Sequence, residues 1–471
     1  MIKSMLIWLS SLVLQVALVP VHAAAGTNAY LLHSPTPAQV QAVCQRYGFQ
    51  IVRSINNTDL YLVQLSDSVP PNVLRDWVKN DPDVKNLEFD GSAKVPEASA
   101  PNNPARSIAP PLQTPISDKK LIKLYGAGAW VSYVQQPALA VISGSDRGRD
   151  STGAGIVAII DTGVDPQQPL LRSVLVPGYD FTRGVAGLAS EMSDINQSTA
   201  AILQQSTSAI LERTKVVQLN QSTAAILEQS TAAVLEGQQL PAYFGHGTMV
   251  AGLVHLVAPT AKIMPLKAFK ADGSARNSDI VQAVYYAADH GANVINMSFS
   301  MGTFSDELMR ALNYATRHGV ICVASVGNDN QKDLVYPAAL NNVVGVASTT
   351  LEDHRSAFSN YGSDLVTVGA PGEGLITTYP GNHYAQVWGT SFSSALVAGG
   401  AALLEDIFGV NSNPGLQVGD VKRALSEAVP CASSATSPCT FGDIGYGRVN
   451  LSAAQQYIAR IKIPATPPPP K

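Results

Sequence analysis

Three residues with the chemistry of acyl transfer stand far apart in this sequence, each close to a glycine and a threonine. Asp161 begins an Asp-Thr-Gly motif, His246 lies inside a Gly-His-Gly-Thr motif, and Ser391 ends a Gly-Thr-Ser motif. In such a set the serine hydroxyl attacks a carbonyl carbon, the histidine takes its proton, and the aspartate holds the imidazole in the required tautomer. The order Asp, His, Ser distinguishes this set from the two other common orders of the same residues. The pattern therefore predicts acyl chemistry with a serine nucleophile.

The neighbouring residues predict how these side chains are presented. Asp161 ends the apolar run 156–160, which is typical of a buried parallel strand. His246 and Ser391 each precede a stretch of apolar and small residues, which predicts a buried helix. A serine at a helix N-terminus gains a favourable dipole and backbone N–H donors for a developing oxyanion.

The elements that must position these residues alternate along the chain from residue 121 onward. Strands are predicted at 155–161, 262–268, 294–297, 320–325 and 343–348, and helices at 127–133, 138–143, 279–290, 306–318, 391–408 and 419–428. This alternation predicts an α/β fold with a doubly wound, mostly parallel sheet. In such folds the functional residues lie at the carboxyl ends of the strands.

Four motifs resemble the subtilase family of serine peptidases. They are VAIIDTGVD at 157–165, GHGTMVAG at 245–252, ASVGN at 324–328 and GTSFSSALVAG at 389–399. The resemblance implies a subtilisin-like catalytic domain, residues 117–460, and a serine endopeptidase made as a self-processing proenzyme. It implies that Asp161, His246 and Ser391 form the triad. Asn328 would then be the side-chain donor of the oxyanion hole, a group whose loss typically costs on the order of 10²–10³ in rate.

The same resemblance implies where a polypeptide substrate binds. The residues that would shape the first pocket are Ser298, Phe299, Ser300, Ala324, Ser325, Val326 and Gly327. The first three follow a predicted strand and are similar to the family segment that pairs with the substrate main chain, as an added β-strand would. Many family members have glycine in place of Ser300, so a narrower pocket mouth is expected. Because this set contains no acidic residue, strict selectivity for basic side chains is not expected.

Residues 26–92 form a separate predicted unit. Strands are expected at 30–32, 49–52, 60–63 and 84–89, and helices at 37–46 and 71–79. The order βαββαβ predicts a small α+β split-βαβ fold. Subtilases commonly carry such a prodomain, so the resemblance implies an intramolecular inhibitor that assists folding and lies along the substrate groove. An unrelated α/β module kept in the mature protein is the alternative.

The two ends and the region after the first unit have the composition of processing and linker segments. Lys3 precedes an apolar run at 5–19, and small residues lead to Ala23, which predicts a signal peptide over residues 1–23. The run is short for a membrane anchor, so a secreted protein is expected, extracellular or periplasmic and without membrane contact after cleavage. Residues 93–116 predict an exposed linker, and 461–471 an extended Pro-rich tail.

An insert at residues 190–240 interrupts the resemblance between Asp161 and His246. It contains near-copies of one octapeptide at 197–203, 205–211, 221–227 and 229–235. Their composition favours helix, opened by Asp194 and Gln197 as a capping box. An eight-residue period turns the apolar stripe by about 80° per repeat, so one straight helix would not keep a single apolar face. A broken or paired helix is therefore favoured, with the break near residues 213–219. An even period keeps each side chain on one face of a strand, so a β structure is the alternative.

The net charge and the cysteine positions limit which other partners, disulfides and metal sites are expected. The formal net charge of −4 gives no reason to expect nucleic acid or an anionic membrane as a partner. Cys431 and Cys439 flank a Ser/Pro-rich loop and are expected to be bridged. Cys322 is interpreted as a packed thiol, and Cys44 as free or buried. No cysteine spacing suggests a metal site, and the triad requires no cofactor; calcium commonly stabilises the family, but no ligand set is assigned.

Two other functions fit parts of this pattern. A catalytically idle relative would use the insert as a binding surface, but the intact triad and Asn328 argue against it. An esterase or lipase would use the same triad. Its usual G-x-S-x-G motif is absent at Ser391, and the order that begins with aspartate also disfavours it. A serine endopeptidase that acts on polypeptides is the favoured function.

Overall fold

The computed structural model describes most of both predicted domains. The described residues are 28–94, 121–143, 151–196, 217–218, 224–226, 240–408, 417–427 and 443–462, without residues 58, 66–68, 125, 188 and 426. The predicted signal peptide, most of the linker, most of the octapeptides, the loop from Cys431 to Cys439 and the tail beyond residue 462 lie outside them.

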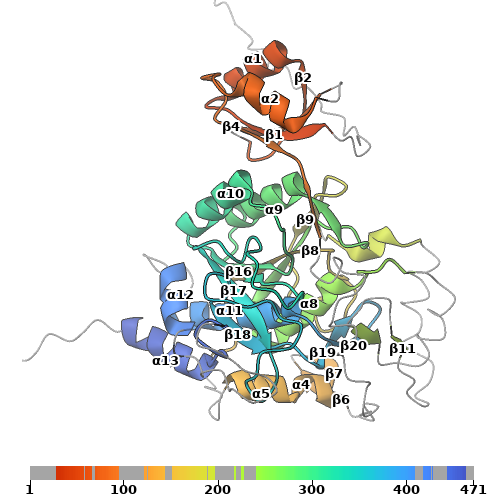
Figure 1. The fold of residues 1–471 in the computed structure, drawn as a ribbon. Coiled ribbons are helices and arrows are strands. Elements are labelled where there is room, and N and C mark those ends of the chain that lie inside the picture. The colour runs from red at the N-terminus through yellow and green to blue at the C-terminus, as the bar shows by residue number, and fades with distance from the viewer. Residues whose placement is uncertain are drawn as a thin grey trace, which may run out of the picture.

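The large domain is organised around one eight-stranded sheet, at the centre of Figure 1. Its strands, in spatial order, are β10 (Val185–Gly187), β9 (Gly178–Asp180), β13 (Lys262–Lys267), β8 (Ile156–Asp161), β15 (Val294–Met297), β16 (Ile321–Ser325), β17 (Val343–Thr349) and β18 (Val368–Pro371). All neighbours pair in parallel except β10 with β9. The predicted doubly wound, mostly parallel sheet is confirmed, and Asp161 lies at the carboxyl end of its β8.

Each face of the sheet has its own hydrophobic core. Val157 and Ile159 of β8 face one core, and the alternating Ala158 and Ile160 face the other. The first core contains α8 (His246–Val257) and α11 (Thr390–Phe408), and the second contains α9 (Asn277–Asp289) and α10 (Asp306–Arg317). Figure 1 shows the four helices on these two sides. A strand buried on both faces explains why 156–160 is an unbroken apolar run.

Smaller helices complete the first layer. They are α5 (Pro137–Ser143), α12 (Val418–Leu425) and α13 (Leu451–Lys462), and residues of all three belong to the first core. By length and composition α11 could cross a membrane, but 83% of its most apolar window is buried inside the fold, as expected of a core helix. Cys322 on β16 and Cys44 are buried free thiols, in agreement with the predicted packed thiol.

The N-terminal unit has the predicted split-βαβ order. Its elements are β1 (Ala29–His33), α1 (Pro37–Tyr47), β2 (Phe49–Ser54), β3 (Leu60–Leu65), α2 (Pro71–Val78) and β4 (Asn86–Phe89). The strands form one antiparallel sheet in the order β2-β3-β1-β4. A separate core lies between this sheet and its two helices. The prodomain role of this unit stays a prediction.

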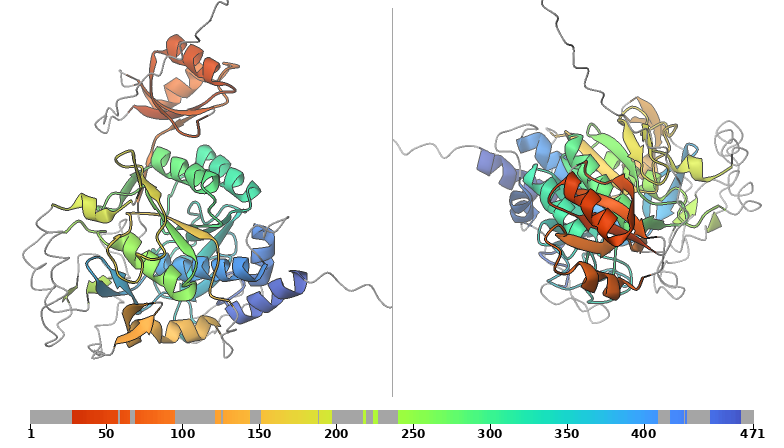
Figure 2. Two further views of the ribbon diagram at one scale, coloured as in Figure 1. Left: turned by 180° about the vertical axis from the view of Figure 1, so that it is seen from behind. Right: turned by 90° about the horizontal axis from the view of Figure 1, so that it is seen from above.

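The N-terminal unit contacts the large domain at the starts of α9 and α10. Figure 2 shows this unit, in red and orange, against one side of the large domain. Glu88 accepts a hydrogen bond from the N–H of Glu307 at 3.1 Å, and Asp90 accepts from the N–H of Ser278 at 2.8 Å. The first N–H groups of a helix lack partners within the helix, and its dipole favours a negative charge there. The unit thus supplies a carboxylate to each helix N-terminus.

A short strand extends this contact beyond the predicted boundary of the unit. β5 (Ser92–Lys94) pairs with β14 (Ser274–Arg276) of the large domain. The linker was predicted to begin at residue 93, so its first two residues are paired strand instead of exposed chain. The open edge of β14 offers the backbone partners that composition alone does not reveal.

The helix predicted at 127–133 is wrong for its first part. Residues Ala127–Trp130 form β7, which pairs with β6 (Leu121–Leu124), and only Val131–Val134 are helical, as α4. Gly126 has φ +90°, which allows the tight turn between the two strands. The ring of Trp130 stacks on Tyr384, with 4.9 Å between centroids, and this contact holds the hairpin against the domain.

The favoured helix is also wrong for the described part of the octapeptides. Ala224–Ile226 form β12, between β11 (Val217–Gln218) and β20 (His383–Val387), which pairs in turn with β19 (Leu375–Tyr379). The edge of β20 provides backbone hydrogen bonds, and an even repeat suits a strand. The expected capping box at Asp194 is wrong as well, because Asp194 ends a 3-10 helix and Ile195 after it is extended, so no helix begins there. The Asp194 carboxylate binds Lys267 and the N–H of Ala271. Gln197 lies outside the described residues.

Candidate active site

Asp161 and His246 meet at the carboxyl edge of the sheet. Asp161 ends β8 and His246 begins α8, and the two side chains are almost completely buried. His246 Nδ1 lies 2.8 Å from Asp161 Oδ1, and the N–H of Thr162 donates to the same oxygen at 2.7 Å. With Nδ1 engaged by the carboxylate, Nε2 is the ring atom that would exchange a proton with a nucleophile.

Ser391 is placed beside this pair by the first turn of α11. It is the second residue of that helix and is buried. The ring of the next residue, Phe392, lies against the ring of His246, with 5.6 Å between centroids. Ser391 Oγ donates to the carbonyl oxygen of Ser298 at 3.4 Å, and Ser298 Oγ donates to the carbonyl oxygen of Ser391 at 2.9 Å. These contacts fix the start of α11 against the end of β15.

Asn328 lies just beyond the end of β16, next to the same helix start. Its Oδ1 accepts from the N–H of Thr390 at 2.9 Å and from Thr390 Oγ1 at 3.0 Å. Because the amide oxygen is engaged in this way, the orientation of the Nδ2 donor is also set. A side-chain donor beside a helix N-terminus is the arrangement that stabilises an oxyanion.

The comparisons with known proteins address the family directly. The profile of the subtilase family matches residues 153–447. The chain belongs to the subtilase family. The family predicted from the four motifs is thereby confirmed. Subtilases are serine-type endopeptidases. The catalytic roles of the individual residues stay predictions.

Curated relatives of this subtilase include several named proteinases. It is 31% identical over 301 residues to the thermophilic serine proteinase of Bacillus sp. (strain AK1). This alignment covers 64% of this chain and 61% of that protein. It is 36% identical over 219 residues to subtilisin BL of Lederbergia lenta, covering 45% of this chain and 77% of the relative. It is 34% identical over 223 residues to thermitase of Thermoactinomyces vulgaris, covering 45% and 75%. The chain thus spans less than two thirds of the first of these relatives.

Solved structures show that the fold of this subtilase is shared beyond the motifs. Fervidolysin from Fervidobacterium pennivorans gives a TM-score of 0.64 at 21% identity, over 91% of this chain and 61% of that one. The epidermin leader peptide processing serine protease of Staphylococcus aureus gives 0.62 at 17% identity, over 91% and 98%. At these identities the likeness shows the subtilisin-like fold alone.

The predicted substrate-binding residues follow two adjacent strands. Ser298, Phe299 and Ser300 follow β15. Ala324 and Ser325 end β16, which pairs in parallel with β15, and Val326 and Gly327 come directly after it. Both segments therefore meet beside Ser391 at one edge of the sheet. The side chain of Phe299 is buried against Phe269, with 5.0 Å between centroids, so Phe299 can present only its backbone to a substrate.

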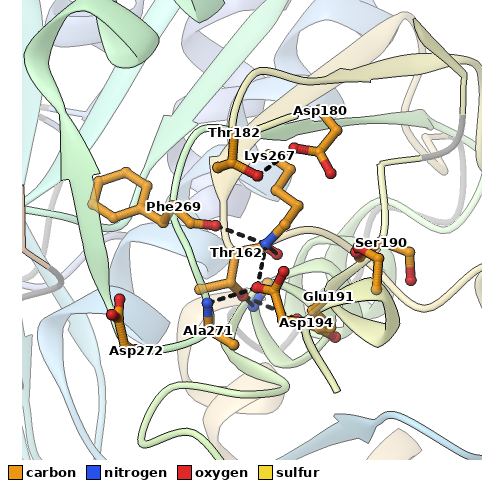
Figure 3. Close-up of polar contacts among 12 residues, drawn as sticks. Thr162, Asp180, Thr182, Ser190, Glu191, Asp194, Lys267, Phe269, Ala271 and Asp272 are labelled. Carbon is orange, nitrogen blue, oxygen red and sulfur yellow. Dashed lines mark hydrogen bonds and ion pairs between the residues drawn. The ribbon is translucent and has the colours of Figure 1, made fainter. Parts of the chain in front are cut away.

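A buried lysine lies behind the Asp161 turn of this subtilase (Figure 3). Lys267 Nζ donates to the carbonyl oxygens of Thr162 at 2.7 Å and Phe269 at 2.8 Å, and to Asp194 Oδ2 at 2.7 Å. Burying an ammonium group requires such partners. Lys267 therefore ties the residue after Asp161 to Asp194, where the insert begins.

The possible calcium site, for which the sequence assigns no ligands, stays a prediction. None of their His, Cys, Asp and Glu side chains gather in a group of three or more that could hold a metal ion. At the oxygen cluster of Figure 3, positive charge comes from the Lys267 ammonium group, and Arg183 pairs with Asp180 and Asp194 of the same cluster. The structure thus provides no basis for assigning a calcium ligand set within the described ranges.

Asn360 is a site residue that the sequence reasoning missed. Its Oδ1 accepts from the N–H groups of Asp329 and Gln331, each at 3.0 Å, and its Nδ2 donates to the carbonyl oxygen of Val326 at 2.9 Å. Asn360 thus braces the loop that carries Asn328 on both sides. It lies 32 residues further along the chain, and no motif connects it to that loop.

Proposed function

We propose that this chain is a serine endopeptidase that hydrolyses peptide bonds in polypeptides. Asp161, His246 and Ser391 form its triad, and Asn328 donates to the oxyanion. The observation that carries the proposal is the buried 2.8 Å contact between His246 Nδ1 and Asp161 Oδ1, beside the helix start that holds Ser391. Membership of the subtilase family supports the same reaction class.

The mechanism follows from the positions of these groups. Ser391 Oγ attacks the carbonyl carbon of the scissile bond while His246 Nε2 takes the hydroxyl proton, and Asp161 stabilises the imidazolium that forms. The oxyanion develops beside the N-terminus of α11 and receives a hydrogen bond from Asn328 Nδ2. His246 then gives its proton to the leaving amine. Water, activated in the same way, releases the acyl group from Ser391.

The N-terminal unit is the proposed prodomain and intramolecular inhibitor. Glu88 and Asp90 cap the two surface helices of the catalytic domain, and β5 continues into that domain as a paired strand. These contacts hold the C-terminal end of the unit against the catalytic domain that it would inhibit. Together with the predicted signal peptide and linker, they support a secreted proenzyme that cuts itself between the two domains.

An active-site label tests this function. A fluorophosphonate probe should modify Ser391 in the processed protein, and Ser391→Ala should abolish both labelling and cleavage of the proform. Ser393→Ala is the matched control, because this nearby buried hydroxyl donates only to the carbonyl oxygen of Pro371, at 3.2 Å, among the described contacts. A processed wild-type protein that resisted the probe and cut no peptide would instead support the idle binding protein.

A further inference from the structure

The carboxyl group of Glu191 is buried between the two segments that carry Asp161 and His246. Glu191 begins η2 (Glu191–Asp194), a 3-10 helix at the root of the repeat-bearing insert. Thr162 Oγ1 donates to Glu191 Oε2 at 2.9 Å, and Thr248 Oγ1 donates to Glu191 Oε1. Thr162 directly follows Asp161, and Thr248 is close behind His246. Glu191, drawn in Figure 3, therefore joins the two segments from a third.

Backbone groups on the far side of each hydroxyl set the direction of these hydrogen bonds. Thr162 Oγ1 accepts from the N–H of Gly247 at 3.0 Å, and Thr248 Oγ1 accepts from the N–H of Asp165 at 2.8 Å. Each threonine hydroxyl thus accepts a hydrogen bond from the opposite segment and donates one to Glu191. The result is a two-way cross-link that ends on one carboxyl group.

Two motif glycines make room for this cross-link. Gly163 has φ +106°, a conformation that residues with side chains rarely adopt, and a Cβ there would lie 2.6 Å from the backbone nitrogen of Glu191. A Cβ on Gly247 would overlap the carbonyl oxygen of Gly163. The absence of both side chains lets the aspartate segment, the histidine segment and η2 pack against one another.

Charged and titratable groups surround the Glu191 carboxyl. Burial raises its pKa to about 8; the two threonine hydroxyls and the positive charge of Lys267 act in the opposite direction, and the charge of Asp161 adds to the rise. Tyr379 of β19 also lies within the field of Glu191. His246 of α8 faces the same cluster through Asp161. The cross-link therefore sits in an electrostatic environment shared with the triad.

We propose that Glu191 is a positioning residue for catalysis, which sets the placement of His246 relative to Asp161 through the hydroxyls of Thr162 and Thr248. The inference rests on the proposed peptidase function, because this placement matters for proton transfer by His246. Because η2 lies at the start of the insert, this role would also link the insert to the placement of the catalytic residues.

The substitution Glu191→Gln in the processed enzyme tests this role. Above pH 8 the carboxyl group is ionised and both of its oxygens accept, so the assay is run there. Glutamine keeps the size of the side chain but replaces one acceptor with an NH₂ group, which cannot accept a hydrogen bond from a threonine hydroxyl. We expect kcat to fall on the order of 10²-fold, the typical cost of a misplaced catalytic group. KM should change little, because ground-state binding of the substrate is not involved. The low-field proton resonance of His246 Nδ1–H should shift.

Ser190→Ala is the matched control. Ser190 caps η2, since its Oγ accepts from the N–H of Met192 at 3.2 Å, so this change loosens the same turn without removing the carboxyl. We expect its kcat to stay near the wild-type value. An equal loss of kcat in Ser190→Ala and Glu191→Gln would overturn the proposal, because it would assign the effect to the fold of η2.

A wild-type kcat with an unmoved His246 resonance in Glu191→Gln would also overturn it. Labelling of Ser391 by the fluorophosphonate probe would persist in that case, which separates this failure from a failure of the proposed function. If Glu191→Gln does not fold, Thr248→Val carries the same test, because it removes one hydroxyl of the cross-link and keeps the shape of the side chain. The same drop in kcat and the same shift are then expected.

Discussion

The two halves of the candidate site are held in place by different kinds of groups. Charged or ionisable side chains, Glu191 and Lys267, brace the half that contains Asp161 and His246. Neutral amides and hydroxyls make the buried contacts of the other half, where Asn360 holds the loop of Asn328 and Ser298 holds the start of α11. Arg355 donates to Asn330 Oδ1 at the exposed end of this loop. The two halves therefore differ in their expected response to charge and pH.

The difference follows from what each half must do. His246 gains a positive charge during the reaction, so its surroundings must accept a change of charge without moving. Buried charges need partners, and Lys267 and Asp194 provide them for each other. The oxyanion half only has to aim donors at one point, and neutral hydrogen bonds fix such geometry. We expect charge-changing substitutions to act mainly on the first half and neutral ones mainly on the second.

The largest effect is expected from removing the buried ammonium group. Lys267→Met leaves Asp194 without one of its partners and two buried carbonyl oxygens without a donor, which should lower the free energy of unfolding by about 3 kcal/mol. Chemical denaturation in a Ser391→Ala background, which prevents self-digestion, measures this change. Lys262→Met is the control at the exposed start of the same strand, where Nζ donates only to the carbonyl oxygen of Ser173 among the described contacts. Its effect should stay within about 0.5 kcal/mol.

The residues proposed to act could be predicted from the sequence, whereas the residues that hold them could not. Asp161, His246 and Ser391 stand in motifs whose glycines and small residues already indicate close backbone packing. Glu191 and Asn360 are single polar residues in segments without a pattern, and only the tertiary fold brings them to their partners. Thr162 and Thr248, close after Asp161 and His246, indicate that their hydroxyls need hydrogen-bond acceptors. The sequence does not indicate that Glu191 provides both.

The fold itself was predictable where burial dictates the pattern. Strands buried on both faces are continuous apolar runs, which is why β8, β15 and β16 matched their predicted positions closely. The predictions failed where an open strand edge decided the structure. Ala224–Ile226 has the composition of a helix, yet it pairs with the edge of β20. Such an edge belongs to a distant part of the chain, so composition does not reveal it.

A smaller effect is expected in the neutral half. Asn360→Ala removes three hydrogen bonds around the loop of Asn328, so kcat should fall by roughly 10–100-fold, which corresponds to about 1.4–2.7 kcal/mol in the activation barrier. If Asn360 acts by aiming Asn328, the double variant with Asn328→Ala should lose little more than Asn328→Ala alone. Fully additive losses in kcat would show that Asn360 acts on the fold in general. Asn342→Ala, at a partly buried asparagine that bonds Asn313, is the control.

The pH dependence of stability distinguishes the two halves most sharply. Because burial raises the pKa of Glu191 to about 8, the folded protein holds a proton that the unfolded chain releases above its ordinary value of 4.5. The stability contribution of this group is therefore complete below pH 4.5 and is lost as the pH rises to about 8, by at most about 1.4 kcal/mol per pH unit.

Glu191→Gln should remove the part of that slope that this group contributes, and the change in chemical denaturation should be clearest between pH 7 and 8, above the pKa of Glu405. Glu405→Gln provides the comparison, because burial raises the pKa of Glu405 to about 7 on α11, away from the cross-link. Its slope should end about one pH unit earlier, and its loss should leave kcat unchanged. Asn360→Ala should leave the slope intact, because it removes no titrating group. A slope between pH 7 and 8 that Glu191→Gln left unchanged, or that Asn360→Ala removed, would contradict the distinction between a charged and a neutral half.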